Sequence, residues 1–299
     1  MATPAAYQAY RRTTGPLPRT IEKTTETFPS TLAADEVLIR IHAVSLNFRD
    51  IGMLDGRYPL PSLDHGIPAS DCAAEVIKTG SEVKEFSVGD RVMNTIDLNN
   101  IFDEDENPFL ALGGEIDGVL RQYAVFKEKH LLPIPAHLSW EEASIIPCAV
   151  ITAWLALNMP SSSSTSTTKK PKTALLEGTG GVSLAALLLC LAAGITPIIT
   201  SSSDAKLSAL LAKLPNTDIA TINYSTHPAW DTEAKALTAG RGVDIVVNNA
   251  GPASLRRGVD ALAKGGSVSL VGFLAGAGEG EGLGPEGVMK VLVKSAVVR

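Results

Sequence analysis

The second half of the chain alternates between short apolar runs and longer stretches with the spacing of helices. The apolar runs cover residues 173–177, 195–200, 218–223, 243–248 and 267–272, and the helical stretches cover 181–193, 204–213, 228–238 and 253–263. Strands that are apolar throughout and are joined by helices predict a parallel sheet covered on both faces. We therefore expect an α/β fold here, with a doubly wound sheet of the kind that binds dinucleotides.

The first half has a different pattern, in which polar and apolar residues alternate over short β-branched segments. These segments cover residues 36–45, 72–78, 89–93 and 122–126, with turns between them. The pattern predicts a small β-barrel-like domain. A helical pattern at 140–158, interrupted at Pro147, marks the change, so we place one domain at 1–145 and the other at 146–299. Two polar stretches, 97–108 and 160–171, are expected to be surface loops.

Charge and composition exclude several classes of protein. The formal net charge of −6 repels phosphate backbones and anionic lipids, so we expect no nucleic-acid and no membrane partner. The longest apolar stretch, 182–200, is broken by Gly194 and Pro197, and each half is too short to span a bilayer. Cys72, Cys148 and Cys190 form no disulfide or metal-binding spacing. The N-terminus has no secretory pattern, so we expect a cytoplasmic protein.

A glycine-rich turn follows the first predicted strand of the sheet. It consists of Gly178, Thr179, Gly180, Gly181 and Val182, and Ser183 stands where a Gly-x-Gly-x-x-Gly pattern would have its third glycine. Glycines allow the backbone to approach a pyrophosphate, and the helix that follows presents free N–H groups to it. The position between an apolar strand and a long apolar helix makes this turn a candidate dinucleotide site.

The end of the second predicted strand indicates which dinucleotide is bound. A site for NAD places an acidic residue there to bind the ribose 2′-hydroxyl. Here the segment reads Thr200, Ser201, Ser202, Ser203, and Lys206 follows. Hydroxyl groups and a lysine suit a 2′-phosphate, whereas Asp204 lies late for the ribose and can serve as a helix cap. The sequence therefore favours NADPH as the cofactor.

Eight segments resemble the medium-chain dehydrogenase/reductase superfamily, in particular its quinone oxidoreductase-like and enoyl reductase-like branch. They are LNFRDIGMLDGRYP (46–59), SDCAAEVIKTGSEVKEFSVGDRVM (70–93), ITAWLAL (151–157), EGTGGVSLAAL (177–187), ITSSSDAKL (199–207), INYSTHPAW (222–230), GRGVDIVVNNAGP (240–252) and SVSLVGFLAG (267–276). They occur in the order of the family and cover almost the whole chain. The resemblance implies a GroES-like domain followed by a Rossmann domain, with hydride transfer in the cleft between them.

The resemblance also implies candidate site residues. Asn47, Arg49, Asp50 and Tyr58 match residues that line the cleft near the nicotinamide. Asn47 would donate to a substrate oxygen, and Tyr58 would pack on the substrate or donate a proton. A structural ion pair between Arg49 and Asp50, with Tyr58 as simple wall, is the alternative. Beyond the glycine turn and the serine segment, the implied cofactor residues are Thr152, Tyr224, Asn249, Gly251, Gly272, Phe273 and Leu274.

The same resemblance implies a member without zinc. Zinc-dependent relatives have a cysteine where this chain has Asn47 and a Gly-His-Glu where it has Ala69-Ser70-Asp71, and they carry four cysteines around 97–112. A thiolate and imidazole ligand set cannot be assembled from these residues, so we expect no metal. Without a metal ion, the expected chemistry is hydride transfer to an enone, an enoyl thioester or a quinone, with hydrogen-bond donors stabilising the enolate oxygen.

Three functions remain open from the sequence. They are an NADPH-dependent reductase of a small-molecule quinone or enone, a trans-acting enoyl reductase of a polyketide-type pathway, and a catalytically silent NADPH-binding or regulatory protein. Residues 292–299 resemble the beginning of a sixth strand, beyond which relatives continue, so we expect the chain to lack the segment that returns to the first domain. Homodimers are common in the superfamily, and a homodimer is an open alternative.

Overall fold

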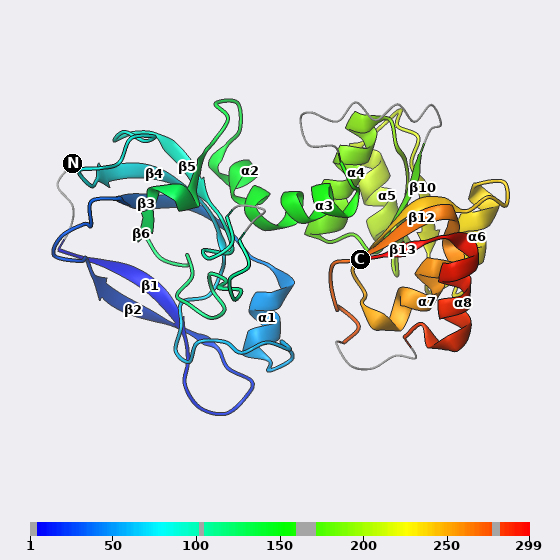
Figure 1. Ribbon diagram of the computed structural model, residues 1–299, viewed down its shortest axis with the longest axis horizontal. Coiled ribbons are helices and arrows are strands. Elements are labelled where there is room, and N and C mark those ends of the chain that lie inside the picture. Colours follow the sequence, from blue (N-terminus) through cyan, green and yellow to red (C-terminus); the bar gives the residue numbers. More distant parts are fainter. Residues whose placement is uncertain (1–4, 102–104, 160–171, 277–281) are drawn as a thin grey trace. The chain divides into compact units, whose positions relative to one another are not determined.

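The computed structural model describes residues 5–101, 105–159, 172–276 and 282–299. The chain divides into two compact units, Met1–Cys148 and Ala149–Arg299 (Figure 1), whereas the sequence places the boundary after residue 145. The surface loop predicted at 160–171 lies outside the described residues, as do residues 102–104 of the loop predicted at 97–108.

The first unit contains a β-hairpin and a five-stranded antiparallel sheet. The hairpin pairs β1 (Ala6–Arg12) with β2 (Ile21–Thr27). The sheet has the order β6–β3–β4–β5–β7, with β3 at Glu36–Ser45, β4 at Asp71–Thr79, β5 at Arg91–Asn94, β6 at Tyr123–Lys127 and β7 at Leu131–Pro133. The helices of the unit are α1 (Phe48–Leu54), the short 3-10 helix η1 (Glu128–His130) and α2 (Trp140–Ser144).

Alternating side chains explain the sheet of the first unit. Val37 and Ile39 of β3, Ala74 and Val76 of β4, and Phe126 of β6 are buried in one cluster. Successive side chains of a strand point to opposite faces, so this alternation buries one face. The four strands predicted in this half are present, and β3 has the predicted bounds. β1, β2 and β7 were not expected, and the polar sequence of β2 in particular gives no apolar alternation.

The second unit is a six-stranded parallel sheet. Its order is β10–β9–β8–β11–β12–β13, with β8 at Thr173–Leu176, β9 at Thr196–Ser201, β10 at Ala220–Asn223, β11 at Val243–Asn248, β12 at Leu262–Leu270 and β13 at Val297–Val298. Numbered along the chain this is 3-2-1-4-5-6, the Rossmann order. The strand order reverses between β8 and β11, which is where such sheets bind their ligands.

Helices cover both faces of this sheet (Figure 1). They are α3 (Ile151–Ala156), α4 (Gly181–Ala193), α5 (Asp204–Lys213), α6 (Trp230–Leu237), α7 (Pro252–Ala261) and α8 (Gly284–Lys294). Leu176 and Val247 pack with α3, α4 and α5, whereas their neighbours Leu175 and Val246 pack with α6, α7 and α8. Both faces therefore need apolar residues, which explains the continuous apolar runs and confirms the predicted fold class.

The predicted elements of the second domain differ from the structure mainly near the beginning and the end of that domain. The π-helical turn η2 (Ile146–Val150) contains Pro147 and accounts for the interruption expected there. β12 begins at Leu262 rather than at residue 267, because the Gly265–Gly266 pair forms an irregularity within the strand and not a turn before it. Val297 pairs with Ser267, which provides the expected sixth strand, while residues 292–294 belong to α8. Among the described residues, no helix is long and apolar enough to cross a membrane.

Candidate functional site

The glycine turn lies where β8 ends and α4 begins. Gly178 has a φ of +83°, a conformation that favours glycine. Cβ atoms placed on Gly178 and on Gly180 would meet no atom within 4 Å. Gly180 is the N-cap residue of α4 and Gly181 its first residue, so the first N–H groups of the helix lie beside this open space. The turn therefore has the geometry that admits a phosphate group.

Ser183 has a structural role at the position of the third glycine. Its hydroxyl donates to the backbone oxygen of Glu177 at 2.8 Å and accepts from Nδ2 of Asn249 at 2.9 Å. The same amide nitrogen of Asn249 donates to the oxygen of Glu177 at 3.1 Å. Asn249, predicted as a cofactor residue, thus uses its side-chain donors to join the carboxyl ends of β8 and β11.

The serine segment at the end of β9 turns into α5. Ser201 is buried, and its hydroxyl accepts from the backbone N–H of Ser203 at 3.3 Å. Ser203 caps α5 by accepting from the backbone N–H of Lys206. Asp204 is the first residue of α5 and not its cap; it is exposed, and its Oδ1 accepts from Nδ2 of Asn223 at 2.8 Å. Ser202 and Lys206 are exposed at this edge of the sheet.

Two glycines bring the loops after β11 and β12 together. A Cβ on Gly251, whose φ is +98°, would lie 2.9 Å from Cα of Phe273, and one on Gly272 would lie 2.7 Å from the oxygen of Asn249. The close approach allows the N–H of Leu274 to donate to the oxygen of Asn249 at 3.1 Å. The predicted residues of these loops are therefore adjacent, and the glycines hold the two loops against each other.

A pocket of about 350 Å³ opens at the carboxyl ends of the strands. Its walls come from the glycine turn, the end of β9, the loop after β10, the start of α6, the loop after β11, α7 and the loop after β12. The lining residues are Glu177, Gly178, Thr200, Tyr224, Trp230, Ala250, Ala253, Ser254, Leu274 and Ala275. Gly178, Tyr224 and Leu274 were predicted as site residues.

Glu177 was not predicted, and it is the acidic group of the pocket. Its side chain is 7% exposed. Oε2 accepts from the hydroxyl of Ser254 at 2.9 Å and from the N–H of Ala250 at 3.3 Å, while Oε1 has no partner among the described residues. Burial raises the pKa of Glu177 to about 7, and the hydrogen bonds from Ser254 and the backbone oppose that rise. A charged residue at the end of an apolar strand, directly before a glycine turn, is the sequence signal for it.

In the first unit, Asn47 and Asp71 form a hydrogen-bonded pair. Nδ2 of Asn47 donates to Oδ2 of Asp71 at 2.7 Å, and the hydroxyl of Ser70 donates to Oδ1. Asp71 and Ser70 are fully buried, and Asn47 is half-buried. Burial raises the pKa of Asp71 to about 6, although the hydrogen bonds from Ser70 and Asn47 lower it. Each oxygen of this carboxyl therefore has a donor.

The other predicted catalytic residues lie on or beside α1. Asp50 is buried and accepts from the backbone N–H groups of Asn47, at 2.8 Å, and Ala69, at 3.1 Å. Arg49 donates to the backbone oxygen of Leu112, so Arg49 and Asp50 have separate partners and the structural ion pair is not formed. Tyr58 is half-buried, and its N–H donates to the oxygen of Gly52 at the end of this turn.

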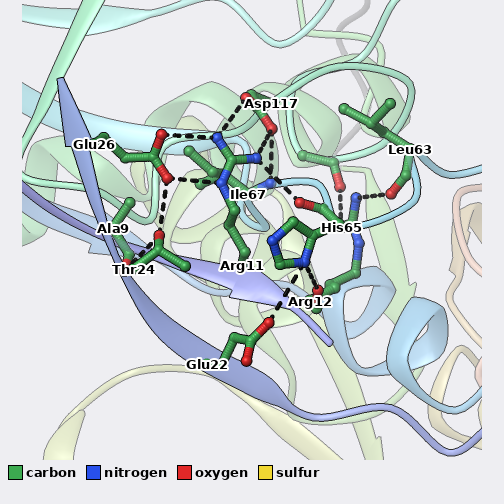
Figure 2. A network of polar contacts seen from close by, with 11 residues as sticks. Ala9, Arg11, Arg12, Glu22, Thr24, Glu26, Leu63, His65, Ile67 and Asp117 are labelled. Carbon is green, nitrogen blue, oxygen red and sulfur yellow. Dashed lines mark hydrogen bonds and ion pairs between the residues drawn. The ribbon is translucent and has the colours of Figure 1, made fainter. Parts of the chain in front are cut away.

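Two arginines of β1 fix the segments around α1 (Figure 2). Arg11 pairs with Glu26 at 2.7 Å and with Asp117 at 3.0 Å. Arg12 is 1% exposed and donates to the backbone oxygens of Leu63 and Gly113 at 3.0 and 2.8 Å. The hairpin thus joins segments that are distant in sequence, and Arg12 also donates to the sulfur of Met53 in α1 at 3.6 Å.

The predicted site residues therefore fall into two groups. Asn47, Arg49, Asp50 and Tyr58 belong to the first unit. The second unit brings together the glycine turn, the serine segment, Tyr224 and the two loops that contain Asn249, Gly251, Gly272, Phe273 and Leu274. Thr152 lies on α3, half-buried, outside the residues that line the pocket.

Comparisons with known proteins identify the family. The model of the alcohol dehydrogenase GroES-like domain matches residues 33–136, and that of the zinc-binding dehydrogenase matches residues 181–298. A zinc-type alcohol dehydrogenase-like protein of Schizosaccharomyces pombe is 39% identical over 253 residues, which are 84% of this chain and 71% of that protein. The chain belongs to the medium-chain dehydrogenase/reductase superfamily. As a member of this superfamily it is an oxidoreductase, and the superfamily uses nicotinamide cofactors.

Two further proteins are similar to this chain. A quinone oxidoreductase of Pseudomonas syringae pv. Tomato DC3000 has a TM-score of 0.74 and 25% identity, covering 98% of this chain and 80% of that one. A phenolphthiocerol/phthiocerol polyketide synthase of Mycobacterium tuberculosis is 30% identical over 234 residues, which are 78% of this chain and 9% of that protein.

The residues of this superfamily member do not fit a zinc ion at the position that zinc-dependent relatives use. Asn47 and Ser70 stand there with Asp71, and Nδ2 of Asn47 is a donor to Asp71 rather than a metal ligand. The neighbouring Cys72 is fully buried, and burial raises the pKa of its thiol, which disfavours the thiolate that binds zinc. In the part of the chain that the structure describes, no group of three or more histidine, cysteine or acidic side chains could hold a metal.

Proposed function

We propose that this protein is a zinc-independent, NADPH-dependent reductase that acts on a quinone or an activated C=C bond of a small molecule in the cytoplasm. The observation that carries the proposal is the glycine turn, where open space at Gly178 and Gly180 lies at the N-terminus of α4, beside the point where the strand order reverses. Bound NADPH supplies the hydride, while the protein supplies binding, orientation and hydrogen-bond donors.

The end of β9 supports NADPH over NADH. An NAD site has an acidic group at the strand end that accepts from the ribose, whereas the acid of this segment, Asp204, is the first residue of α5, and its Oδ1 accepts from Asn223 at 2.8 Å. Ser202 and Lys206 are exposed at the same edge, where a hydroxyl and an ammonium group suit a 2′-phosphate.

Asn47 is the proposed donor to the substrate oxygen. A carboxylate only accepts hydrogen bonds, so Asp71 fixes the side-chain amide of Asn47 with Nδ2 towards Oδ2. The second N–H of that amide is then available to stabilise negative charge on a carbonyl oxygen as the C=C bond is reduced. Asp71 acts through Asn47 and is a positioning residue.

A second candidate function is favoured by the relative from Mycobacterium tuberculosis, which is a polyketide synthase. In that case the substrate would be an enoyl thioester on a carrier protein, and the chain would act on it in trans. Turnover that requires the carrier, with none on the free thioester or on quinones, would favour this alternative over the small-molecule reductase.

The first experiment compares two lysines of α5 by fluorescence titration with NADPH and NADH. Lys206→Ala removes the ammonium group proposed to bind the 2′-phosphate, and Lys213→Ala is the matched control in the last turn of the same helix. We expect Lys206→Ala to weaken NADPH binding about tenfold, because charge-assisted hydrogen bonds are strong, and to leave NADH binding unchanged. Equal effects of the two variants on both nucleotides would remove the basis for NADPH specificity.

Turnover on the same protein tests the reaction. Consumption of NADPH with a quinone or a small enone would support the reductase. NADPH binding without turnover on quinones, enones or carrier-bound enoyl thioesters would favour a silent NADPH-binding protein. If neither nucleotide binds, the proposed function is wrong.

A further inference from the structure

Glu177 lies directly before the glycine turn. It is the last residue before Gly178, so its carboxyl lies three residues ahead of the N-cap residue of α4, Gly180. It also lies at the N-terminus of α7, where the N–H of Ala250 and the hydroxyl of Ser254 donate to it. Helix N-termini stabilise anions, and the N-terminus of α7 is already occupied by the carboxyl group of Glu177.

The two oxygens of Glu177 have different surroundings. Both donors bind Oε2, and Oε1 is buried without a partner among the residues that the structure describes. A buried polar atom without a hydrogen bond is costly, and such atoms call for an explanation by a ligand or by strain. Glu177 lines the pocket at the carboxyl ends of the strands, so a ligand in that pocket can reach it.

The pocket suits the adenosine half of a dinucleotide. Apart from Glu177 its lining is uncharged, with the aromatic rings of Tyr224 and Trp230 and the aliphatic side chain of Leu274. Its volume of about 350 Å³ falls in the range of small-ligand pockets. Gly178 belongs both to this pocket and to the open turn, so a dinucleotide would extend from one to the other.

A pyrophosphate at the turn and an ionised Glu177 would repel each other. Like charges in a poorly solvated site disfavour simultaneous ionisation. Burial already raises the pKa of Glu177 to about 7 in the absence of a ligand. When the carboxyl is protonated, the repulsion is removed, and an O–H on Oε1 can donate to a phosphate or ribose oxygen, while Oε2 continues to accept from Ser254.

The elements around Glu177 contribute few other ionisable groups. The first nine residues of α4 contain no acid or base, and β9 contains none. Tyr224 follows β10, and Asp204 and Lys206 lie in the first turn of α5. Asp231 of α6 pairs with Arg257 of α7 at 2.7 Å. The remaining base near the start of α7, Arg256, pairs with Asp260 and Glu286.

We infer that Glu177 is a residue of the dinucleotide site and that its carboxyl takes up a proton from solvent when the dinucleotide binds. The inference rests on the proposed function, since it requires a dinucleotide at the glycine turn. The inference adds a residue to the site and makes cofactor affinity dependent on pH. Binding weakens as pH rises above the pKa of Glu177, because free Glu177 is then ionised and must take up a proton at a falling proton concentration.

Calorimetric titration with NADPH, in buffers of different ionisation enthalpy, measures the protons taken up. At pH 8 and above the 2′-phosphate is a dianion, since its second pKa is about 6, so it contributes little. We expect uptake approaching one proton per NADPH at pH 8 in the unmodified chain, and a Kd that increases up to about tenfold per pH unit above pH 8.

Two variants identify the group. Glu177→Gln should abolish the uptake and bind NADPH at pH 9 at least about tenfold more tightly than the unmodified chain. Asp218→Asn, an exposed acid in the loop before β10, should bind like the unmodified chain. NADPH binding without proton uptake at pH 8 in the unmodified chain overturns the inference alone, as does uptake retained by Glu177→Gln. Absence of binding of NADPH and NADH in every form overturns the proposed function, and the inference with it.

Discussion

Among the described residues, each unit buries one carboxyl with a raised pKa, and the two carboxyls have different surroundings. Asp71 has a donor on each oxygen, Ser70 on Oδ1 and Asn47 on Oδ2. Glu177 has both of its donors, Ser254 and the N–H of Ala250, on Oε2, and none on Oε1 among the described residues. Burial is the main cause of the raised pKa in both, to about 6 for Asp71 and about 7 for Glu177.

The difference separates two uses of a buried acid. A carboxyl whose oxygens both accept from the protein is complete without a ligand, and it fixes its neighbours, here the amide of Asn47. A carboxyl with one oxygen unpartnered beside a pocket is complete only when something else binds. Burial and pKa alone would place the two acids in one class, whereas the distribution of donors separates them.

The largest expected effect is on the pH dependence of stability. Folding raises the pKa of Glu177 from 4.5 to about 7, so its contribution to the free energy of unfolding is present in full below 4.5 and is lost as pH rises through about 7. The loss is about 3 kcal/mol between pH 4 and pH 8, at about 1.4 kcal/mol per pKa unit. Glu177→Gln should remove this loss and be more stable than the unmodified chain at pH 8.

Urea unfolding at pH 5 and pH 8, followed by circular dichroism, measures that difference. Asp218→Asn serves as the control and should keep the full pH dependence. If Glu177→Gln is less stable than the unmodified chain at pH 8, then Oε1 is satisfied in the folded protein and the contrast with Asp71 disappears.

A smaller effect is expected on turnover in the first unit. Asn47→Ala removes the proposed donor and should lower kcat about 100-fold, in line with the loss of one oxyanion donor, with NADPH affinity unchanged. Asp71→Asn should lower kcat about tenfold, because the amide of Asn47 is no longer held by a carboxylate.

The pH profile of kcat distinguishes positioning from a purely structural role. Asp71 is ionised above its pKa of about 6, so the turnover of the unmodified chain should fall as pH drops through 6. Asp71→Asn should lose this acidic limb, and Glu82→Gln, an exposed acid of the same unit, should keep it. An unchanged acidic limb in Asp71→Asn would show that Asp71 does not act on the reaction.

The sequence predicts much of the fold because local patterns carry it. Strands with two covered faces are apolar at consecutive positions, so the parallel sheet and the bounds of α4 and α5 could be predicted. The hairpin of β1 and β2 could not, since it is held by contacts such as Arg11 with Asp117, which are 106 residues apart. Such contacts leave no periodicity in the sequence.

The candidate site was predictable where a residue type is tied to a backbone conformation. Gly178 requires a positive φ and Gly251 a close approach, so their positions can be recognised in sequence. Glu177 depends on Ser254, 77 residues later, and on the loop at Ala250. Oε1 of Glu177 becomes buried without a partner only when the unit folds. The hydrogen bond from the side-chain amide of Asn249 to the oxygen of Glu177 likewise forms only in the folded unit.

The smallest expected effect tests the donors themselves. Ser254→Ala removes one of the two donors to Oε2 of Glu177 and should raise the pKa of Glu177 further. The free energy of unfolding at pH 8 should fall by about 1 kcal/mol, the usual value of one hydrogen bond, and the fall should be smaller at pH 5, where Glu177 is protonated. Ser70→Ala is the matched change at Asp71. The loss of unfolding free energy that it causes should change with pH around pH 6, the pKa of Asp71.

A double variant separates the charge of Glu177 from the packing of Ser254, which also accepts from Nδ2 of Asn248 at 2.9 Å. In a Glu177→Gln background, Ser254→Ala should cost the same at pH 5 and pH 8, because no titrating group remains beside it. If the cost still increases with pH in that background, Ser254 acts on another acid. The hydrogen bond to Oε2 would then not be the feature that distinguishes Glu177 from Asp71.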